Sequence, residues 1–210
     1  MECILCLNDS VPFELDTFEC QTCRVVFKNP ENHPKPEFEL ARYELHNNDP
    51  EDQRYVNFLK QLTTPLENFL KKTDSAIDFG CGPGPALSQM MQERGYDFVH
   101  YDPYFFADAH LLIPEFYNVL TSTEVVEHFH FPYQSWKQMI DLVADNGYLA
   151  IMTQFLIPQV DYKSWWYKND PTHLVFYREE TMNYIAKAYD LEIVYNDKKS
   201  VIIFQKKEVL

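Results

Sequence analysis

The chain lacks strong clusters of basic residues, and this absence excludes one broad class of partner. Its 210 residues contain 18 Lys and Arg against 32 Asp and Glu, giving a formal net charge of −14. The basic clusters are three lysine pairs, at 71–72, 198–199 and 206–207, which are predicted to be solvated edges beside strands. Because broad binding to nucleic acid needs clustered cations to neutralise phosphates, the charge balance argues against such binding.

Long apolar runs are also absent. No stretch approaches the roughly 20 apolar residues that a membrane-spanning helix requires, and the sequence has no internal repeat or low-complexity tract. The first three residues carry neither a basic region nor a long apolar stretch, so no signal peptide is predicted. We therefore expect a cytoplasmic protein without a membrane partner.

Composition favours one main domain with a small appendage. Apolar residues make up 46% of the chain, which is enough for a buried core, and aromatic residues make up 16%. The aromatic surplus could line a binding pocket or simply fill the core. We expect a cysteine module at 1–30, a linker and helical cover at 31–74, and the main domain at 75–210.

Four of the five cysteines lie in the first 30 residues, in two C-x2-C pairs: Cys3, Cys6, Cys20 and Cys23. Each pair can offer two thiolates from one tight turn, and two such turns complete a tetrahedral Zn²⁺ site. Since all four ligands would come from the protein, the site would be closed and structural. The alternatives are two disulfides or a redox-active C-x2-C motif. Disulfides are uncommon in cytosolic proteins, and redox activity would require only one of the two pairs. The sequence therefore favours zinc, in a small module like a zinc ribbon.

A glycine-rich junction marks the main domain. The apolar stretch 76–79 includes Asp78, and Gly80, Gly82 and Gly84 follow it before a predicted helix begins at Ala86. Glycines at this point allow a ligand to approach the backbone where a Cβ would collide. Asp102 ends the next apolar stretch, where a nucleoside ligand needs a carboxylate for its ribose hydroxyls. Together these features predict a nucleoside cofactor.

The chemistry of the loop distinguishes between cofactors. Dinucleotides use G-x-G-x-x-G and backbone amides that hold a pyrophosphate, whereas Pro83 and Pro85 each remove an amide donor here. Asp78 also places negative charge beside the loop. A cationic sulfonium cofactor without phosphate suits these features, so we predict S-adenosylmethionine (SAM). A strand-to-helix turn without a ligand is the alternative.

Strands and helices alternate after residue 75, which predicts an α/β fold with a doubly wound, mostly parallel sheet. Cover helices are expected at 37–46, 50–62 and 65–71. Expected strands are 76–79, 97–101, 117–122 and 148–153, and expected helices are 86–93, 133–143 and 179–189. A terminal hairpin at 191–195 and 201–205 completes the sheet.

Three motifs in order, at 78–84, 101–103 and 123–128, resemble the successive motifs of class I SAM-dependent methyltransferases. The resemblance covers about the last two-thirds of the chain. Segments 41–46 and 170–177 further resemble a bacterial subgroup of these enzymes that carries a short N-terminal cysteine module. The resemblance to class I methyltransferases implies a Rossmann-like sheet that ends with an antiparallel strand. Compared with most relatives, which insert a strand and a helix at 107–116, this segment is unusually short.

The resemblance also implies roles for individual residues. Asp78 and the glycine loop would hold the methionine end of SAM, Asp102 its ribose, and the residues after Asp102 its adenine. The full expected cofactor-binding set is Asp78, Phe79, Gly80, Cys81, Gly82, Gly84, Asp102, Pro103, Tyr104, Thr123, Glu124 and Tyr43. Cys81 is interpreted as a small loop residue and not as a nucleophile.

Two histidines are candidates for acid–base chemistry. His128 and His173 could accept a proton from an attacking hydroxyl or amine, because the free pKa of histidine is close to neutral. A structural role in capping or packing is the alternative for His128. The aromatic insert 154–170 is interpreted as a lid or substrate wall, or alternatively as a segment buried against the N-terminal helices. Expected substrate contacts are His46, Trp166 and Tyr167.

The sequence thus predicts an enzyme that transfers a methyl group from SAM to an oxygen or nitrogen of a small molecule or protein side chain. Two other functions are open: an RNA methyltransferase that docks through the zinc module, and a non-catalytic scaffold that retains SAM. The low count of basic residues weighs against the first. The presence of both Asp78 and Asp102 weighs against the second.

Overall fold

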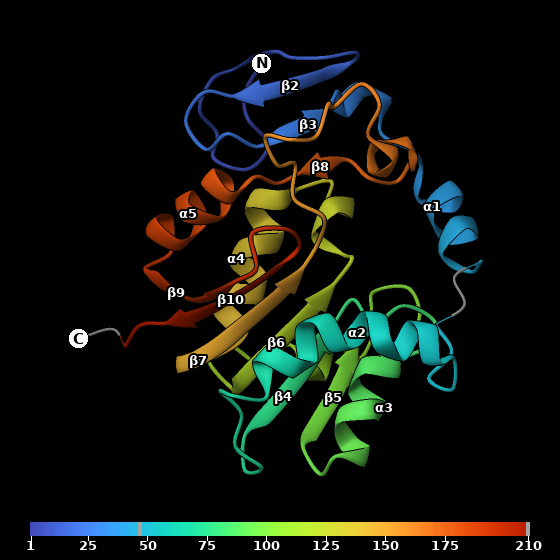
Figure 1. Ribbon diagram of the computed structural model, residues 1–210, viewed down its shortest axis with the longest axis vertical. Coiled ribbons are helices and arrows are strands. Elements are labelled where there is room, and N and C mark those ends of the chain that lie inside the picture. Colours follow the sequence, from blue (N-terminus) through green and yellow to red (C-terminus); the bar gives the residue numbers. More distant parts are fainter. Residues whose placement is uncertain (46–47, 209–210) are drawn as a thin grey trace.

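The main domain is built on a six-stranded sheet, seen in a computed structural model that describes residues 1–45 and 48–208 (Figure 1). The strand order is β5-β4-β6-β7-β10-β9. The strands are β4 (Ser75–Phe79), β5 (Asp97–Tyr101), β6 (Tyr117–Thr123), β7 (Val143–Met152), β9 (Leu191–Asn196) and β10 (Val201–Lys206). The first four run parallel, whereas β10 is antiparallel to both β7 and β9. This confirms the predicted mostly parallel sheet with a terminal antiparallel hairpin.

Helices cover both faces of the sheet, as a doubly wound fold requires. Side chains alternate between the faces of a strand, so neighbours such as Ala76 and Ile77 belong to different cores. On one face lie α2 (Gln53–Leu66) and α3 (Ala86–Glu93), with Ala76. On the other lie α4 (Pro132–Leu142) and α5 (Glu179–Ala188), with Ile77.

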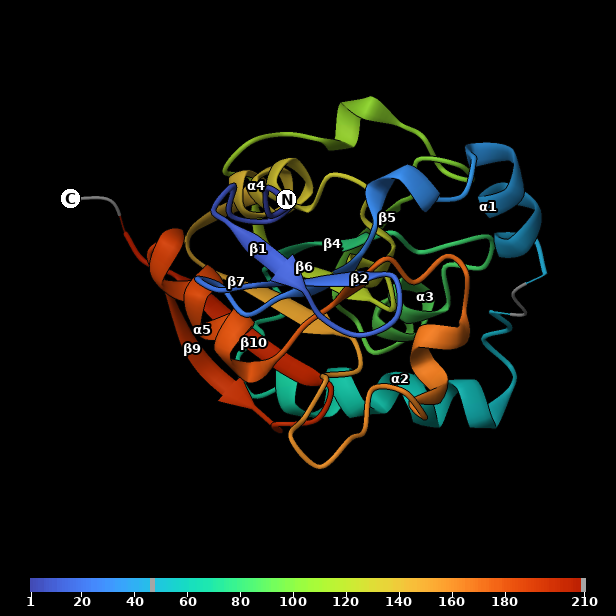
Figure 2. The same cartoon turned by 90° about the horizontal axis from the view of Figure 1, so that it is seen from above.

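A second, antiparallel sheet lies above the edge where the parallel strands end (Figure 1, Figure 2). It contains β1 (Ser10–Pro12), β2 (Thr17–Cys20), β3 (Val26–Lys28) and β8 (Val175–Phe176), in that order. The last strand comes from the C-terminal half of the chain. Residues of the cysteine module, such as Val25 and Phe27, are buried in the same apolar cluster as α4 and α5. The module therefore packs against the main domain and is not a separate unit joined to it only by a linker.

Several predicted boundaries differ from the structure. The helix expected at 50–62 is α2, which continues to Leu66 with Pro65 in its last turn, whereas residues 67–71 of the helix expected at 65–71 are not helical. Leu59, Leu62 and Leu66 are fully buried along one stripe, and this packing holds the turn that proline would otherwise disfavour. The cover helix α1 (Pro36–Tyr43) ends three residues before its predicted limit, and β7 begins five residues before its predicted start.

The segment between β5 and β6 contains one short 3-10 turn, Ala109–Leu111, and no strand. This fits its short length in the sequence. Across 1–45 and 48–208, none of the helices is both long and apolar enough to cross a membrane.

Candidate active site

A cavity of about 900 Å³ opens at the carboxyl ends of β4, β5 and β6. In the sheet order β5-β4-β6-β7, the neighbouring strands β4 and β6 connect onward to β5 and to β7, so their connections leave in opposite directions. Such a reversal opens a crevice, and ligands of parallel α/β proteins bind there. The loops that follow all three strands line the cavity, and α1 and α2 close it from the side.

The glycine loop needs its glycines partly because of its protein neighbours. Gly80 and Gly82 have φ values of +82° and +67°, which favour glycine. A Cβ on Gly80 would lie 2.6 Å from the Val125 side chain, and one on Gly82 would lie 2.7 Å from Asn48 Nδ2. Asn48 Nδ2 also donates a hydrogen bond to the carbonyl of Cys81 (3.4 Å). Asn48 therefore belongs to the cavity wall, although no motif in the sequence identifies it.

Asp102 joins the loops after β4 and β5. Its carboxylate is 7% exposed and accepts hydrogen bonds from the backbone N–H groups of Gly82 (2.9 Å), Tyr104 (2.8 Å) and Phe105 (3.2 Å). A carboxylate can accept about four hydrogen bonds, so acceptor capacity is left for a ligand in the cavity. Pro103, Tyr104 and Phe105 line the cavity beside it.

Asp78 lies buried at the end of β4 and also lines the cavity. Burial, opposed by a hydrogen bond from Thr121 Oγ1 and assisted by the charge of Asp102, raises the pKa of Asp78 to about 7. An acidic group with such a pKa is close to half ionised at neutral pH. A cationic ligand beside it would favour its ionised form.

The two candidate histidines face each other beside the same cavity. Their ring centroids are 4.8 Å apart, and both line the cavity wall. Nδ1 of His128 lies 2.8 Å from the Thr172 carbonyl, and Nδ1 of His173 lies 2.8 Å from the Tyr167 carbonyl. Since a carbonyl oxygen only accepts, each Nδ1 carries the proton and each Nε2 presents a lone pair. Burial lowers the pKa of His173.

Two glutamates after β6 form a buried acidic group that the sequence analysis recognised only in part. Glu124 lines the cavity, and Glu127 is 0% exposed behind it. The Tyr167 hydroxyl donates to both carboxylates. Burial and the neighbouring Glu127 hold the pKa of Glu124 well above its usual range. Glu127 gave no signal in the sequence, because its burial depends on the insert that carries Tyr167.

Helix α1 covers the cavity. The ring of Tyr43 lies 5.3 Å from the ring of His128 and 5.8 Å from the ring of Tyr104. Glu39 forms a hydrogen bond with Nε2 of His130 (2.7 Å), which follows β6, and this contact is one link between α1 and the loops. Arg42 forms an ion pair with Asp170 (2.9 Å), at the end of the insert. These contacts tie α1 to two loops at the carboxyl edge of the sheet.

Comparison with known proteins agrees with this geometry. Residues 51–196 match the family model for a methyltransferase domain. The chain belongs to this methyltransferase family. No protein with a curated description is similar enough in sequence to count as a relative.

Solved structures share the fold. One is a SAM-dependent methyltransferase from Archaeoglobus fulgidus, at 16% identity and a TM-score of 0.51, with 72% of this chain and 99% of that one covered. Another, from Galdieria sulphuraria, is assigned as a sarcosine dimethylglycine methyltransferase, at 12% identity and a TM-score of 0.56, with 81% and 97% covered. A protein from Bacillus halodurans assigned as a methyltransferase has 11% identity and a TM-score of 0.50, with 71% and 99% covered.

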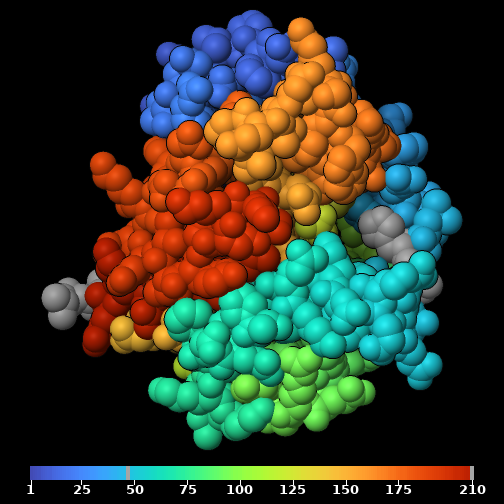
Figure 3. All heavy atoms as spheres, viewed as in Figure 1, coloured from blue at the N-terminus to red at the C-terminus, as the bar shows by residue number. Residues whose placement is uncertain are grey.

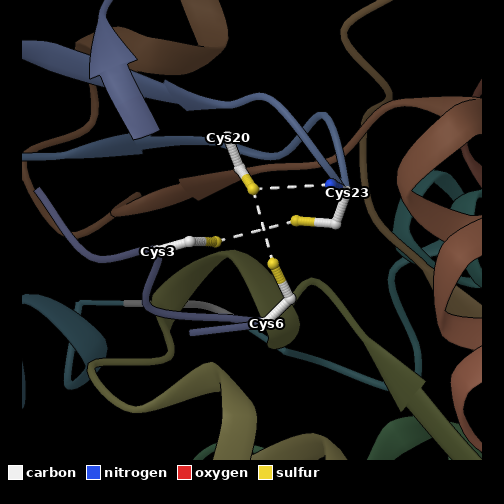
Figure 4. Close-up of side chains that lie close together, drawn as sticks. All are labelled: Cys3, Cys6, Cys20 and Cys23. Carbon is white, nitrogen blue, oxygen red and sulfur yellow. Dashed lines mark hydrogen bonds between the residues drawn. The ribbon is translucent and has the colours of Figure 1, made fainter. Parts of the chain in front are cut away.

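The four N-terminal cysteines of this methyltransferase converge outside the segment that matches the family (Figure 4). Their sulfur atoms lie within 4.8 Å of one another, with Cys3 and Cys23 3.6 Å apart and Cys6 and Cys20 3.4 Å apart. A Zn–S bond of about 2.3 Å implies sulfur atoms about 3.8 Å apart in a tetrahedron, which is close to this geometry. Disulfides would need about 2.05 Å.

Further contacts favour thiolates in the cysteine cluster. A hydrogen bond from the Cys23 thiol lowers the pKa of Cys3 to about 5, whereas the same hydrogen bond raises the pKa of Cys23 and burial raises that of Cys20. Backbone N–H groups of Thr22 and Cys23 point at Cys20 Sγ (3.3 and 3.4 Å), and that of Leu5 points at Cys3 Sγ (3.4 Å). Amides that face sulfur in this way stabilise negative charge on it. The donor set therefore fits a closed Cys₄ metal site.

The aromatic insert does not place its predicted substrate residues on the cavity wall. Trp166 is 67% exposed and lies outside the cavity lining, and Tyr167 is buried behind it, on Glu124 and Glu127. Trp165 packs with Val26 of the cysteine module, as Figure 3 shows for the insert in orange against the blue N-terminus. The apolar side chains of the insert thus pack on the module, while Arg42 of α1 pairs with Asp170 at the end of the insert. His46 lies outside the described residues.

The predicted cofactor residues do gather. Of the twelve, all border the cavity: Asp78, Phe79, Gly80, Cys81, Gly82, Gly84, Asp102, Pro103, Tyr104, Thr123, Glu124 and Tyr43. Their roles toward a cofactor remain predictions, and they enter the proposal below.

Proposed function

We propose that this methyltransferase uses SAM to methylate an oxygen or nitrogen of a small molecule or protein side chain. The cavity's charge carries the proposal. Four acidic side chains line it, Glu39, Asp78, Asp102 and Glu124, whereas Lys35 is the one Lys or Arg on the described part of its wall. A cationic cofactor is favoured by such a wall, and a pyrophosphate is disfavoured.

The residues of the cavity supply orientation, exclusion of water and a place for a proton. When bound, SAM would supply a methyl group on a sulfonium, which is itself a strong leaving group. Asp78 and the glycine loop would hold its methionine end, and Asp102 its ribose. Tyr43 on α1 closes the cavity over His128, which limits the access of water.

The histidine pair supplies the base in this proposal. Because Nδ1 of each ring is occupied by a carbonyl, Nε2 is the atom that can accept a proton from a hydroxyl or amine acceptor. Holding the acceptor between this pair and the sulfonium would align the attacking atom with the methyl carbon. The proposed base is thus part of the cavity wall.

We also propose that Cys3, Cys6, Cys20 and Cys23 hold one structural Zn²⁺. All four positions are protein ligands, so no place is left for a catalytic water. The metal would fix β1, β2 and β3 against β8, which directly follows His173 and Leu174. Its expected role is to support the cavity wall from behind.

Replacing Asp102 with alanine tests the cofactor site. We expect SAM affinity to fall about tenfold or more, because a hydrogen bond to a charged acceptor contributes about 1.5–3 kcal/mol. Asp102→Asn, which keeps one acceptor oxygen, should lose less. Isothermal titration calorimetry with SAM measures both. Asp97→Ala, at the exposed start of the same strand, serves as the control, and unchanged binding in Asp102→Ala would remove Asp102 from the site.

SAM affinity should also rise with pH between about 6 and 8, since the pKa of Asp78 is about 7 and its ionised form attracts a cation. The increase should be at most about tenfold per pH unit. Burial raises the pKa of the nearby Tyr55 and Cys81, so both stay neutral in this range. The negative charge of Asp102 also attracts a cation. Calorimetry across this range should give a flatter profile for Asp78→Asn than for the parent, with Glu124, whose pKa is also raised, left on the same wall. A parent profile that is equally flat would contradict the assignment.

A further inference from the structure

Glu127, His128 and His173 form a second group of potential metal ligands, separate from the cysteines. One carboxylate oxygen of Glu127 and one ring nitrogen from each histidine all lie within 4.8 Å of one another. His128 and His173 border the main cavity, and Glu127 lies immediately behind them. Two histidines and one carboxylate on one side of an ion leave its other positions open, as in non-haem iron sites.

The histidines are oriented as metal ligands usually are. Each donates its Nδ1 proton to a backbone carbonyl, at Thr172 for His128 and at Tyr167 for His173. Metal-bound histidines commonly donate their second nitrogen to a carbonyl or carboxylate, which fixes both the tautomer and the direction of the ring. The lone pair of each Nε2 is therefore the one available for coordination.

The charge of Glu127 is the independent observation. Its side chain is fully buried, and within the described part of the chain its Oε2 has no hydrogen-bond partner. Glu124, half-buried beside it on the cavity wall, likewise has an unpartnered Oε1 within the described part of the chain. Neither carboxylate forms an ion pair with a lysine or arginine of residues 1–45 or 48–208. A fully buried carboxylate without a cation is costly, and a bound divalent ion would compensate it.

We propose that Glu127, His128 and His173 bind a divalent first-row transition ion, such as Fe²⁺ or Zn²⁺, whose open positions face the cavity. Ligand atoms on one ion with bonds of about 2.1 Å lie about 3.0–3.4 Å apart, so separations within 4.8 Å have to shorten by at most about 1.4–1.8 Å. His128, the least buried of the three, is the ligand with most room to move. Imidazole and carboxylate together suit these ions better than Mg²⁺ or Ca²⁺.

The role of this site rests on the proposed methyl transfer. An ion here would coordinate the acceptor's hydroxyl oxygen and lower the pKa of that hydroxyl. The proton would pass to solvent water, and the resulting oxygen anion would attack the methyl carbon as the carbon–sulfur bond breaks. In the metal-loaded protein, coordination therefore replaces direct proton transfer to His128 or His173, since the same nitrogen atoms serve in both.

Cobalt titration tests the site without any acceptor. Protein that retains one zinc in its cysteine cluster is titrated with Co²⁺ and followed by visible absorption and calorimetry. We expect one further equivalent of cobalt, with d–d bands but without the sulfur-to-metal charge transfer that a thiolate ligand gives. Binding of this ion should also raise the melting temperature, because it stabilises the folded state by mass action.

Variants assign the ligands. His128→Ala and Glu127→Gln should each weaken binding of the second cobalt ion by about 100-fold or more. Loss of a residue that only hydrogen-bonds to a metal ligand already lowers metal affinity by about 10–100-fold. His130→Gln, a histidine on the same cavity wall but outside the trio, should bind cobalt like the parent. His128 is partly exposed, so its variant keeps the test valid if Glu127→Gln fails to fold.

Two outcomes would overturn the inference: cobalt that binds only with thiolate bands, or a second equivalent that persists unchanged in His128→Ala. SAM titration of the same samples separates this inference from the proposed function. Cobalt binding without SAM binding would retain the metal site and reject methyl transfer. SAM binding without a second cobalt would do the reverse.

Discussion

Replacing His173 or His128 with alanine is expected to slow methyl transfer by about 10²–10⁴-fold while leaving SAM affinity nearly unchanged. The Nε2 atoms of this pair are the basic atoms that face the cavity beside the proposed methyl position. Neither ring belongs to the glycine loop or contacts Asp102, so cofactor binding should be spared. The rate would fall whether the pair accepts the proton or holds an ion.

The measurement uses SAM with a labelled methyl group and a pooled library of small hydroxyl and amine compounds. Label transferred to the pool gives the rate for each variant, and calorimetry gives its SAM affinity. His110→Ala, exposed on the loop after β5, is the matched control and should behave like the parent. If both variants turn over at the parent rate, the two histidines have a structural role and the acceptor arrives already ionised.

The zinc site carries the second large expected effect. Cys3→Ser combined with Cys20→Ser removes one thiolate from each C-x2-C pair and should lower the zinc content by the one equivalent that the cysteine cluster holds. Structural zinc contributes about 10–16 kcal/mol of apparent binding free energy at neutral pH in small zinc-dependent modules. Cys3 and Cys20 are also buried in the cluster that contains α4 and α5, so the melting temperature of the whole protein should fall.

Elemental analysis of protein purified without chelator measures the zinc. The parent and Cys81→Ser, whose cysteine lies in the glycine loop, should each contain one Zn²⁺ in the cysteine cluster. A double variant that keeps its zinc would exclude these cysteines as ligands. A parent with clearly less than one equivalent would also contradict the assignment.

Local patterns in the sequence predicted most of the sheet. Strand 97–101 and helix 86–93 are found with the predicted bounds, because alternating and helical apolar periodicity is a local property. The glycine loop and Asp102 were predicted for the same reason. A separate helix was expected to begin at Pro65, because proline often opens a helix, whereas α2 continues through Pro65 and the burial of Leu59, Leu62 and Leu66 depends on the sheet.

The parts of the site that were missed depend on contacts between distant segments. Asn48 reaches the glycine loop from a segment some 30 residues earlier, and its backbone and side chain set the space at Gly82 and Gly84. Tyr167 belongs to an aromatic insert without regular period, so no pattern showed that its hydroxyl would face Glu127 rather than the cavity. Trp166 was placed on the substrate wall for the same reason.

Calorimetric titration of the parent protein with SAM and, separately, with NAD⁺ tests the central claim most directly. The acidic cavity and its proline-interrupted glycine loop predict one SAM per chain, with a dissociation constant in the micromolar to millimolar range, and no heat from NAD⁺. Binding of NAD⁺ with comparable affinity, or no binding of SAM at any concentration in that range, would contradict the account.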